Sequence, residues 1–136
     1  MTVVLDTNIL VSACWTPGGL EDRVVQMVLA GELKIAVTPP VWEEYTEVLS
    51  RRKLAALREK STELLSRLHA LAIRVESGAR VMEAGDEDDN RLLECAVAGS
   101  ATFLITGNLR DYPASWLPAR IVNARQFLGT LGIIKT

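Results

Sequence analysis

Acidic and amide side chains are spaced along this 136-residue chain so that a folded domain could gather them into one site. Each has an ordinary structural explanation when it is considered alone, because such residues also cap helices and form turns. Considered together, their oxygen atoms suit Mg²⁺ or Mn²⁺, and a pair of such ions can promote cleavage of a phosphodiester bond. The candidate ligands are Asp6, Glu44, Asp89, Asn108 and Asp111.

The position of Asp89 argues most directly for a chemical role. A helix is expected from about residue 86, and its apolar stripe consists of Leu92, Leu93 and Ala96. At about 100° per residue, Asp89 points almost at the centre of that stripe, whereas Asp88 lies about a quarter turn away. A carboxylate aimed into an apolar face is costly unless it is paired, protonated or bound to a metal ion. The competing explanation is that the acidic run 86–89 only complements the dipole at the start of the helix.

Glu44 lies on an earlier helix, which is predicted over residues 39–50 because proline suits the first turn of a helix. The buried face of this helix is formed by Val41, Tyr45, Val48 and Leu49. Glu44 lies at the edge of that face, one turn into the helix, whereas Glu43 and Glu47 point roughly opposite to it. We therefore expect Glu44 to reach a site at the end of the sheet and the other two glutamates to face solvent.

Short β-branched segments alternate with amphipathic segments along the chain, which predicts strands and helices in turn. The strands are predicted at residues 2–5, 34–38, 73–75, 102–106 and 120–122. The helices are predicted at residues 9–14, 24–29, 39–50, 54–71 in one or two pieces, 86–99 and 124–131. This alternation favours an α/β fold, which we expect as one three-layer α/β/α domain over residues 1–136 with a central, mostly parallel sheet. Ligands of such sheets bind outside the carboxyl ends of the strands, where Asp6 and the segment 106–108 are found.

Composition restricts the class of protein. Hydrophobic residues make up 49% of the chain and charged residues 24%, which is typical of a globular domain and excludes disorder as its main state. No apolar run reaches the ~20 residues that span a bilayer, and the N-terminus lacks the basic start of a signal peptide. Cys14 and Cys95 form no closely spaced pair, so a disulfide framework or a zinc site is disfavoured. We expect reduced core thiols in a cytoplasmic protein that is not bound to a membrane.

Charge is distributed unevenly along the chain. Residues 51–80 carry eight Lys or Arg and three acidic residues, a local net charge of +5, while the rest of the chain has a net charge of −7. This asymmetry suggests a polyanionic partner, although a solvated helical surface would have the same composition. Arg51, Arg52 and Lys53 follow the helix of Glu44, and we expect these cations to hold phosphates beside the acidic site.

Other common kinds of active site do not match the sequence. The chain has no glycine-rich phosphate-binding motif and no serine-nucleophile motif. A calcium-binding loop that starts at Asp86 is excluded, because Arg91 stands where the loop needs glycine and Val97 where it needs glutamate. The single histidine, His69, lies among leucines and far in sequence from the acidic candidates, so we expect it at a helix surface or partly buried.

Four blocks of sequence, taken in this order, resemble the PIN-domain family, which includes the ribonuclease toxins of bacterial toxin–antitoxin pairs. The blocks are 3–10 with Asp6-Thr7-Asn8 at its centre, Glu44-Tyr45, 86–96, and 104–112. The ending 121–132 is also similar, so the resemblance covers essentially the whole chain. Within the family, the chain looks closest to the subgroup of toxin components.

This resemblance implies a Mg²⁺- or Mn²⁺-dependent endoribonuclease that cleaves single-stranded RNA, with Asp6, Glu44 and Asp89 as metal ligands. It implies that Asn108 or Asp111 is the fourth residue of this metal-ligand set. The residues that would orient the ligands or a water molecule are Thr7, Asn8 and Thr106. An antitoxin protein as partner and a homodimer are further implications. Many members of the family have Asp where this chain has Asn108, and an amide is a neutral and weaker ligand.

Two other functions remain open. A PIN-like domain that binds its cation too weakly for turnover would bind RNA or protein without cleaving it, and Asn108 favours this alternative. A metal-dependent phosphatase of the haloacid-dehalogenase type is disfavoured, because that class needs a second Asp where this chain has Asn8.

Overall fold

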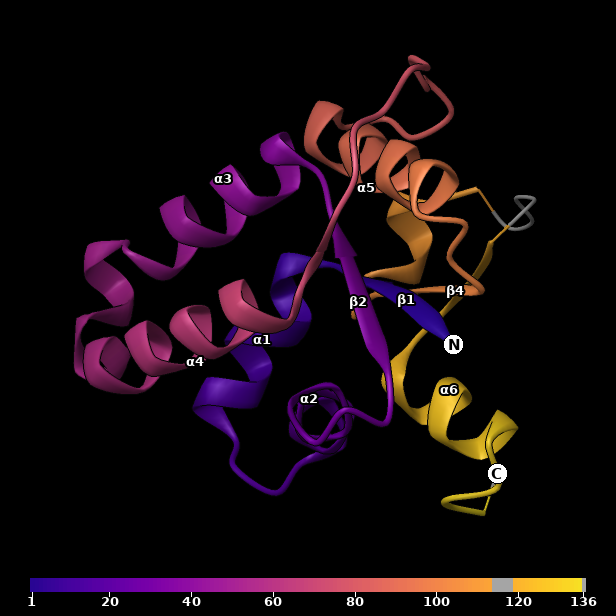
Figure 1. Cartoon of the computed structure of the whole chain (residues 1–136). Coiled ribbons are helices and arrows are strands. Elements are labelled where there is room, and N and C mark those ends of the chain that lie inside the picture. Colours follow the sequence, from indigo (N-terminus) through magenta and orange to yellow (C-terminus); the bar gives the residue numbers. More distant parts are fainter. Residues whose placement is uncertain (114–118, 136) are drawn as a thin grey trace.

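A parallel β-sheet lies at the centre of the protein (Figure 1). The structure is a computed structural model, and it describes residues 1–113 and 119–135. The strands are β1 (Thr2–Leu5), β2 (Lys34–Val37), β3 (Ile73–Arg74), β4 (Phe103–Ile105) and β5 (Arg120–Val122). They pair in the order β3-β2-β1-β4-β5, and every one of these pairings is parallel. The first strand of the chain is therefore the central strand of the sheet.

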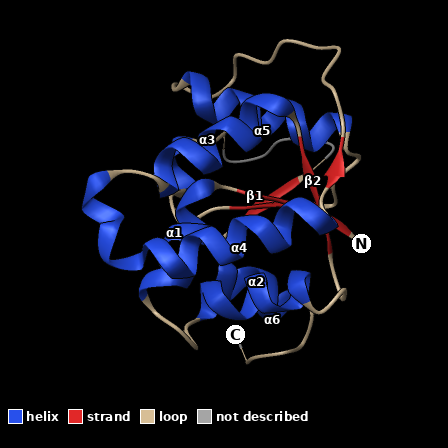
Figure 2. Cartoon of the chain, turned by 60° about the vertical axis from the view of Figure 1, so that its left-hand side comes forward, coloured by secondary structure: helices blue, strands red, loops and turns tan. Residues whose placement is uncertain are grey.

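Helices cover both faces of this sheet, with α3 and α5 on one side and α1, α2, α4 and α6 on the other (Figure 2). The helices are α1 (Thr7–Trp15), α2 (Leu20–Leu29), α3 (Pro39–Leu49), α4 (Arg58–Leu71), α5 (Glu87–Ala98) and α6 (Ala124–Thr130), with short 3₁₀ helices at Arg52–Leu57 and Leu109–Asp111. Apart from Thr2 and Lys34, which begin β1 and β2, the residues of β1, β2 and β4 are buried, as expected for a parallel sheet with helices on both faces. This arrangement is the predicted three-layer α/β/α fold.

The strands β1 and β4 end side by side, and their ends bring distant residues together. Leu5 of β1 is paired with Ile105 of β4, and the next backbone N–H, that of Asp6, donates to the Ile105 carbonyl at 2.9 Å. The backbone N–H of Thr106 donates in turn to the carbonyl of Val122 at 2.9 Å. Asp6 and Thr106 therefore leave the sheet as neighbours at its carboxyl edge, where a ligand site is expected.

The predicted elements are confirmed, and the differences lie at their ends. The first helix begins at Thr7 rather than at residue 9, and the predicted helix 54–71 consists of a 3₁₀ helix followed by α4. The strand β2 ends at Val37, because Thr38 caps α3 by accepting a hydrogen bond from the Val41 backbone at 3.4 Å. Propensity alone does not separate a strand end from a helix cap, since threonine suits both positions.

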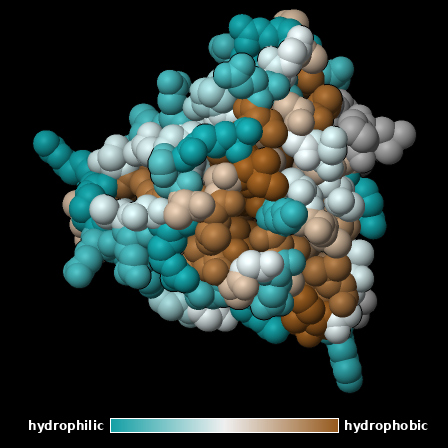
Figure 3. Space-filling view, in the orientation of Figure 1, coloured by the Kyte–Doolittle hydropathy of each residue, from teal (hydrophilic) through white to brown (hydrophobic). Residues whose placement is uncertain are grey.

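Hydrophobic surface crosses the face of the molecule seen in Figure 3, over the region where Figure 1 shows β2 and the end of α4. The strand β3 forms one edge of the sheet, and Leu71 and Ile73 are exposed beside and within it. A strand of two residues that ends in Arg74 offers little for further strand pairing at this edge.

The structure also bears on the expectations about cysteine, histidine and membrane segments. Cys14 and Cys95 are free and buried. His69 is exposed on α4, where its ring packs beside Trp42 with 5.4 Å between the ring centroids. In the ranges that the structure describes, no helix combines the length and the apolar character needed to cross a membrane.

Candidate active site

Asp6 occupies the turn between β1 and α1 at the carboxyl edge of the sheet. It stands at the N-cap position of α1, yet its carboxylate contacts residues that follow β4 instead of capping the helix. Its Oδ2 accepts hydrogen bonds from Thr106 Oγ1 at 2.8 Å and from Tyr112 Oη at 2.9 Å. Asp6 is only 7% exposed, and this burial raises the pKa of its carboxyl group although the hydrogen bonds oppose the shift. The geometry therefore does not support a simple capping role for Asp6.

Asp89 approaches Asp6 from the first turn of α5. The cap of this helix is Asp86, whose Oδ1 accepts from the backbone N–H groups of Asp88 at 2.8 Å and Asp89 at 3.3 Å. The Asp89 side chain is partly buried, and its Oδ1 lies 3.2 Å from Tyr112 Oη. Burial and then the charge of Asp6 raise the pKa of Asp89 to about 7. Asp89 therefore turns inward, as its position on the helix predicts.

Tyr112, which was not among the site residues predicted from the sequence, connects these two carboxylates. The residue is 6% exposed, and its hydroxyl contacts both Asp6 and Asp89. A phenol has one hydrogen to donate, so it cannot donate to both carboxylates at once. Burial and the two neighbouring carboxylates raise the pKa of Tyr112, which keeps the phenol protonated. Tyr112 follows a turn directly, and its local spacing does not distinguish it from an ordinary core aromatic residue.

Glu44 adds a third carboxylate from α3, and we refer to Asp6, Glu44 and Asp89 as the carboxylate cluster. Thr7 Oγ1 donates a hydrogen bond to Glu44 Oε2 at 2.5 Å. The next residue, Tyr45, is fully buried and donates to the Leu5 carbonyl at 2.5 Å, which fixes α3 against the end of β1. Burial raises the pKa of Glu44, and the charges of nearby aspartates raise it further. The exposed glutamates of this helix are Glu43 and Glu47, as expected.

Asn8 and Thr106 join the first turn of α1 to the loop after β4. Asn8 Oδ1 accepts a hydrogen bond from the Gly107 backbone at 2.9 Å. A Cβ atom on Gly107 would lie 3.3 Å from that oxygen, so glycine allows this close approach. The Thr106 hydroxyl donates to Asp6 and accepts from the Asn108 backbone at 3.0 Å. These contacts hold the loop beside Asp6.

Asn108 and Asp111 lie at the rim of the cluster. Both residues are exposed, and they flank or belong to the 3₁₀ helix Leu109–Asp111. The charge of Asp111 contributes to the raised pKa of Asp89, which places it within electrostatic reach of the cluster. The structure thus joins Asp6 and Asp89 through Tyr112 and places Glu44 within electrostatic reach of Asp6. No side-chain hydrogen bond links Asn108 or Asp111 to these carboxylates in the described residues.

The donor set of the carboxylate cluster fits a hard divalent cation. Three buried or partly buried carboxyl groups with raised pKa values would be relieved of their mutual repulsion by such a cation. Among the side chains that the structure describes, no three His, Cys, Asp or Glu residues lie close enough together to form a ready-made metal site. The hydroxyls of Thr7 and Tyr112 contact the carboxylates instead. Coordination of a metal ion by these carboxylates therefore requires their oxygen atoms to move closer together.

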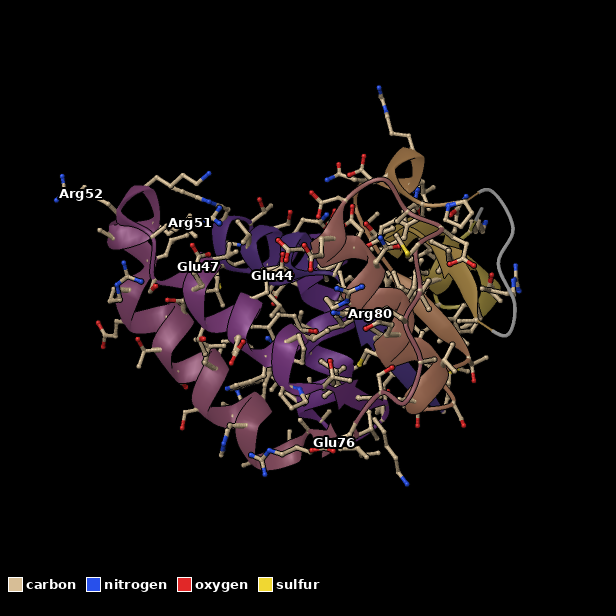
Figure 4. All side chains as sticks on the ribbon, turned by 90° about the horizontal axis from the view of Figure 1, so that it is seen from above. Glu44, Glu47, Arg51, Arg52, Glu76 and Arg80 are labelled. Carbon is tan, nitrogen blue, oxygen red and sulfur yellow. The ribbon has the colours of Figure 1, made fainter. Side chains whose placement is uncertain are left out.

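A groove of about 500 Å³ opens beside Glu44, between α3 and α5 (Figure 4). Its lining includes Glu44 and three arginines, which are Arg51, Arg80 and Arg91. Of the three cations expected to hold phosphates, Arg51 lines this groove, whereas Arg52 points away from Glu44 in Figure 4 and Lys53 is exposed. The placement of Arg51 is compatible with its expected role.

Three cations of the basic segment 51–80 have partners at the C-terminal ends of helices. Backbone carbonyls lack helical partners at these ends, and cations suit the negative end of the helix dipole. The pairs are Arg58 with the carbonyls of Leu49 and Ser50 at the end of α3, Lys60 with that of Cys14 in α1, and Arg74 with that of His69 in α4. These three cations therefore stabilise the ends of helices. Their share of the local charge of +5 does not indicate a polyanionic partner.

Comparisons with known proteins agree with this architecture. A family model described as PIN domain matches residues 2–110. An uncharacterised protein of Methanocaldococcus jannaschii, MJ1680, is 24% identical over 109 residues, which cover 78% of this chain and 70% of that protein. A chain of VapBC2 from Rickettsia felis, in a crystal structure bound to a DNA fragment from their promoter, shares the fold with a TM-score of 0.59 at 18% identity, covering 90% of this chain and 98% of that one. Because the family model matches most of its length, the chain belongs to the PIN domain family.

Proposed function

We propose that this PIN domain is a divalent-metal-dependent endoribonuclease that cleaves single-stranded RNA. The observation that supports the proposal is a hydrogen-bonded network at the carboxyl edge of the sheet, in which Tyr112 joins Asp6 to Asp89 and Thr7, the residue after Asp6, binds Glu44. In the part of the chain that the structure describes, the side chains that donate hydrogen bonds to these carboxylates are hydroxyls and not ammonium or guanidinium groups. Their negative charge therefore remains available for a cation, and membership of the PIN family supports nuclease chemistry.

Each residue has a distinct role in this proposal. Asp6, Glu44 and Asp89 hold the cation, and Asn108 or Asp111 adds an oxygen from the rim. The residues that position the carboxylates and the loop by hydrogen bonds are Thr7, Asn8 and Thr106. Bound Mg²⁺ or Mn²⁺ would supply the Lewis acidity that activates water and stabilises charge on the leaving oxygen. Arg51, Arg52 and Lys53 are proposed to hold phosphates of the RNA.

We further propose that the protein is the toxin of a toxin–antitoxin pair. The support is the fold that it shares with a chain of the VapBC2 complex, and the resemblance of its sequence blocks to PIN-domain toxins. The proposal includes RNA as the substrate, an antitoxin protein as the partner, a homodimer as the form of the toxin and the cytoplasm as the place of action.

A catalytically weak domain that binds RNA or protein is the second candidate function, and Asn108 favours it. Asn108 offers a neutral amide where many PIN domains have a carboxylate, and it is exposed at the rim. A cluster with one carboxylate fewer attracts a divalent cation less strongly. In that case the domain would bind its partner without turnover.

Cleavage of an unstructured RNA in the presence of Mn²⁺, with and without EDTA, tests the proposal. The wild type should cleave, EDTA should abolish cleavage, and Asp6→Asn should lower the rate by orders of magnitude. Glu59→Gln, at an exposed glutamate of α4, has the same charge change and should cleave like the wild type. RNA that is bound but left intact would favour the second candidate, and equal cleavage by the wild type and Asp6→Asn would contradict the site.

A further inference from the structure

A second depression lies next to the groove beside Glu44. It has a volume of about 450 Å³ and shares Pro40, Arg80 and Arg91 with the groove. The two depressions are therefore adjacent, and Arg80 lines both of them. Arg80 lies in the loop between β3 and α5, and Figure 4 shows it on the opposite side of the groove from Glu44. In the sequence, Arg80 is one of the eight cations of the segment 51–80, and no local pattern distinguishes it from the others.

Among the described residues, Arg80 forms no ion pair, in contrast to the other two arginines of the groove. Arg51 is paired with a glutamate of α3, and Arg91 is paired with two glutamates of α5. The pairs are Arg51–Glu47 at 2.9 Å, Arg91–Glu87 at 3.1 Å and Arg91–Glu94 at 2.9 Å. Within residues 1–113 and 119–135, the guanidinium of Arg80 takes part in neither an ion pair nor a hydrogen bond, and the residue is exposed. Arg80 can therefore bind a ligand in this groove without first giving up an ion pair with the described residues.

The backbone next to Arg80 is firmly anchored to α5. The backbone N–H of Val81 donates to Glu94 Oε2 at 2.8 Å. The side chain of Asn90 contacts both the N–H and the carbonyl of Ala84, at 2.8 Å and 3.0 Å. Val81 and Ala84 are buried. This anchor fixes the point at which the Arg80 side chain leaves the loop, so less conformational freedom is lost when a ligand binds.

We infer that Arg80 contacts a phosphate of the RNA strand next to the bond that is cleaved. The inference rests on the proposed function, because it takes the carboxylate cluster as the place of cleavage. Five acidic residues line the groove beside Glu44, Glu44 included, and they repel a phosphate chain unless a cation stands between them. A guanidinium suits this position, since it can give a phosphate two parallel hydrogen bonds. Arg80 thus offsets the repulsion between the RNA strand and the acidic residues of the groove, and it holds the strand by one of its phosphates.

Binding of an RNA probe separates this role from a general effect of charge. The probe is a fluorescein-labelled, unstructured RNA oligonucleotide in Mg²⁺ buffer, and an Asp6→Asn background keeps it intact. In that background, Arg80→Ala should weaken binding several-fold and lower the slope of log affinity against log salt by about one. Arg80→Lys keeps the charge and should keep most of the slope. Arg23→Ala, at an exposed arginine of α2, is the matched control and should bind like its parent.

The outcomes distinguish this inference from the proposed function. Equal salt slopes for Arg80→Ala and Arg23→Ala would overturn the inference, because Arg80 would then be ordinary surface charge. If the wild type cleaves RNA while Arg80→Ala binds it normally, the proposed function stands and Arg80 is removed from the site. A wild type that neither binds nor cleaves RNA overturns both. Thermal melts serve as a check on folding, and Arg80→Ala should melt like its parent because the exposed Arg80 side chain makes no hydrogen bond or ion pair in the described residues.

Discussion

Tyr112 lies within hydrogen-bond distance of Asp89, with 3.2 Å between Oη and Oδ1, and the same hydroxyl lies 2.9 Å from Asp6 Oδ2. The three residues come from the segment after β4, the first turn of α5 and the end of β1, so this contact exists only in the folded chain. One phenolic hydrogen cannot serve two ionised carboxylates. The metal-free cluster is therefore best satisfied when one carboxyl group keeps its proton, in agreement with the pKa of about 7 for Asp89.

We predict that the metal-free protein loses stability as the pH rises from about 4 to about 7. An aspartate with a pKa of about 4 in the unfolded chain and about 7 in the folded protein binds its proton more tightly when folded. Folding is therefore favoured at low pH, and this contribution is lost as the pH rises through that window. The raised pKa values of Asp6 and Glu44 act in the same direction.

Urea unfolding in EDTA over this pH range measures the effect. Asp89→Asn removes the titrating group and should flatten the dependence of the unfolding free energy on pH. A dependence as steep in Asp89→Asn as in the wild type would show that Asp89 does not hold its proton in the folded protein.

We predict that Tyr112→Phe destabilises the metal-free protein by about 1–3 kcal/mol, because two partly desolvated carboxylates lose their shared donor while the ring still fills its place. Mn²⁺ should recover part of this loss, since it supplies positive charge to the same carboxylates. Tyr45→Phe is the control, because it also removes a buried hydroxyl but one bonded to the Leu5 carbonyl. Urea unfolding with and without Mn²⁺ gives the comparison, and a loss for Tyr112→Phe that Mn²⁺ leaves unchanged would separate Tyr112 from the cluster.

Local patterns in the sequence were enough to predict the succession of strands and helices along the chain. They also predicted that the Asp89 side chain faces the interior. Each of these follows from residues that are close in the chain, through the period of a strand or a helix. Tyr112 could not be predicted in this way, because its two contacts join positions that are 106 and 23 residues apart. Its neighbours in the chain are ordinary turn residues, so its role depends on where β4 places the following loop.

The basic segment shows a second limit of sequence patterns. Composition predicts a charged surface, but it does not show which cations lie next to the end of a helix. Arg58, Lys60 and Arg74 find backbone carbonyls of α3, α1 and α4 because the helices end beside them in space. Arg51 and Arg80 line the groove instead, although the local sequence around them does not distinguish them from the other cations of the segment.

We predict that changing Arg51, Arg52 and Lys53 together to Ala weakens RNA binding and flattens its salt dependence, because fewer counterions are released from the RNA. Arg58→Ala should leave the salt slope unchanged and lower the stability by about 1–2 kcal/mol, because α3 loses a donor to its last carbonyls. Fluorescence anisotropy over a salt series and urea unfolding measure the two effects. An unchanged salt slope in the triple variant would refute the placement of RNA beside this segment.

Thermal melts of the wild type, Asp89→Asn and Asp88→Asn, each with and without Mn²⁺, test most directly whether the carboxylate cluster binds the cation. Without metal, Asp89→Asn should melt at the same temperature as the wild type or higher, because repulsion within the cluster is relieved. Asp88 is exposed and its charge raises the pKa of Glu44, so Asp88→Asn makes the same charge change beside the cluster without removing a proposed ligand. We expect Mn²⁺ to raise the melting temperature of the wild type and Asp88→Asn by mass action, and that of Asp89→Asn by less. An equal Mn²⁺-induced shift in the wild type and Asp89→Asn would show that Asp89 is not a ligand and would contradict the proposed metal centre.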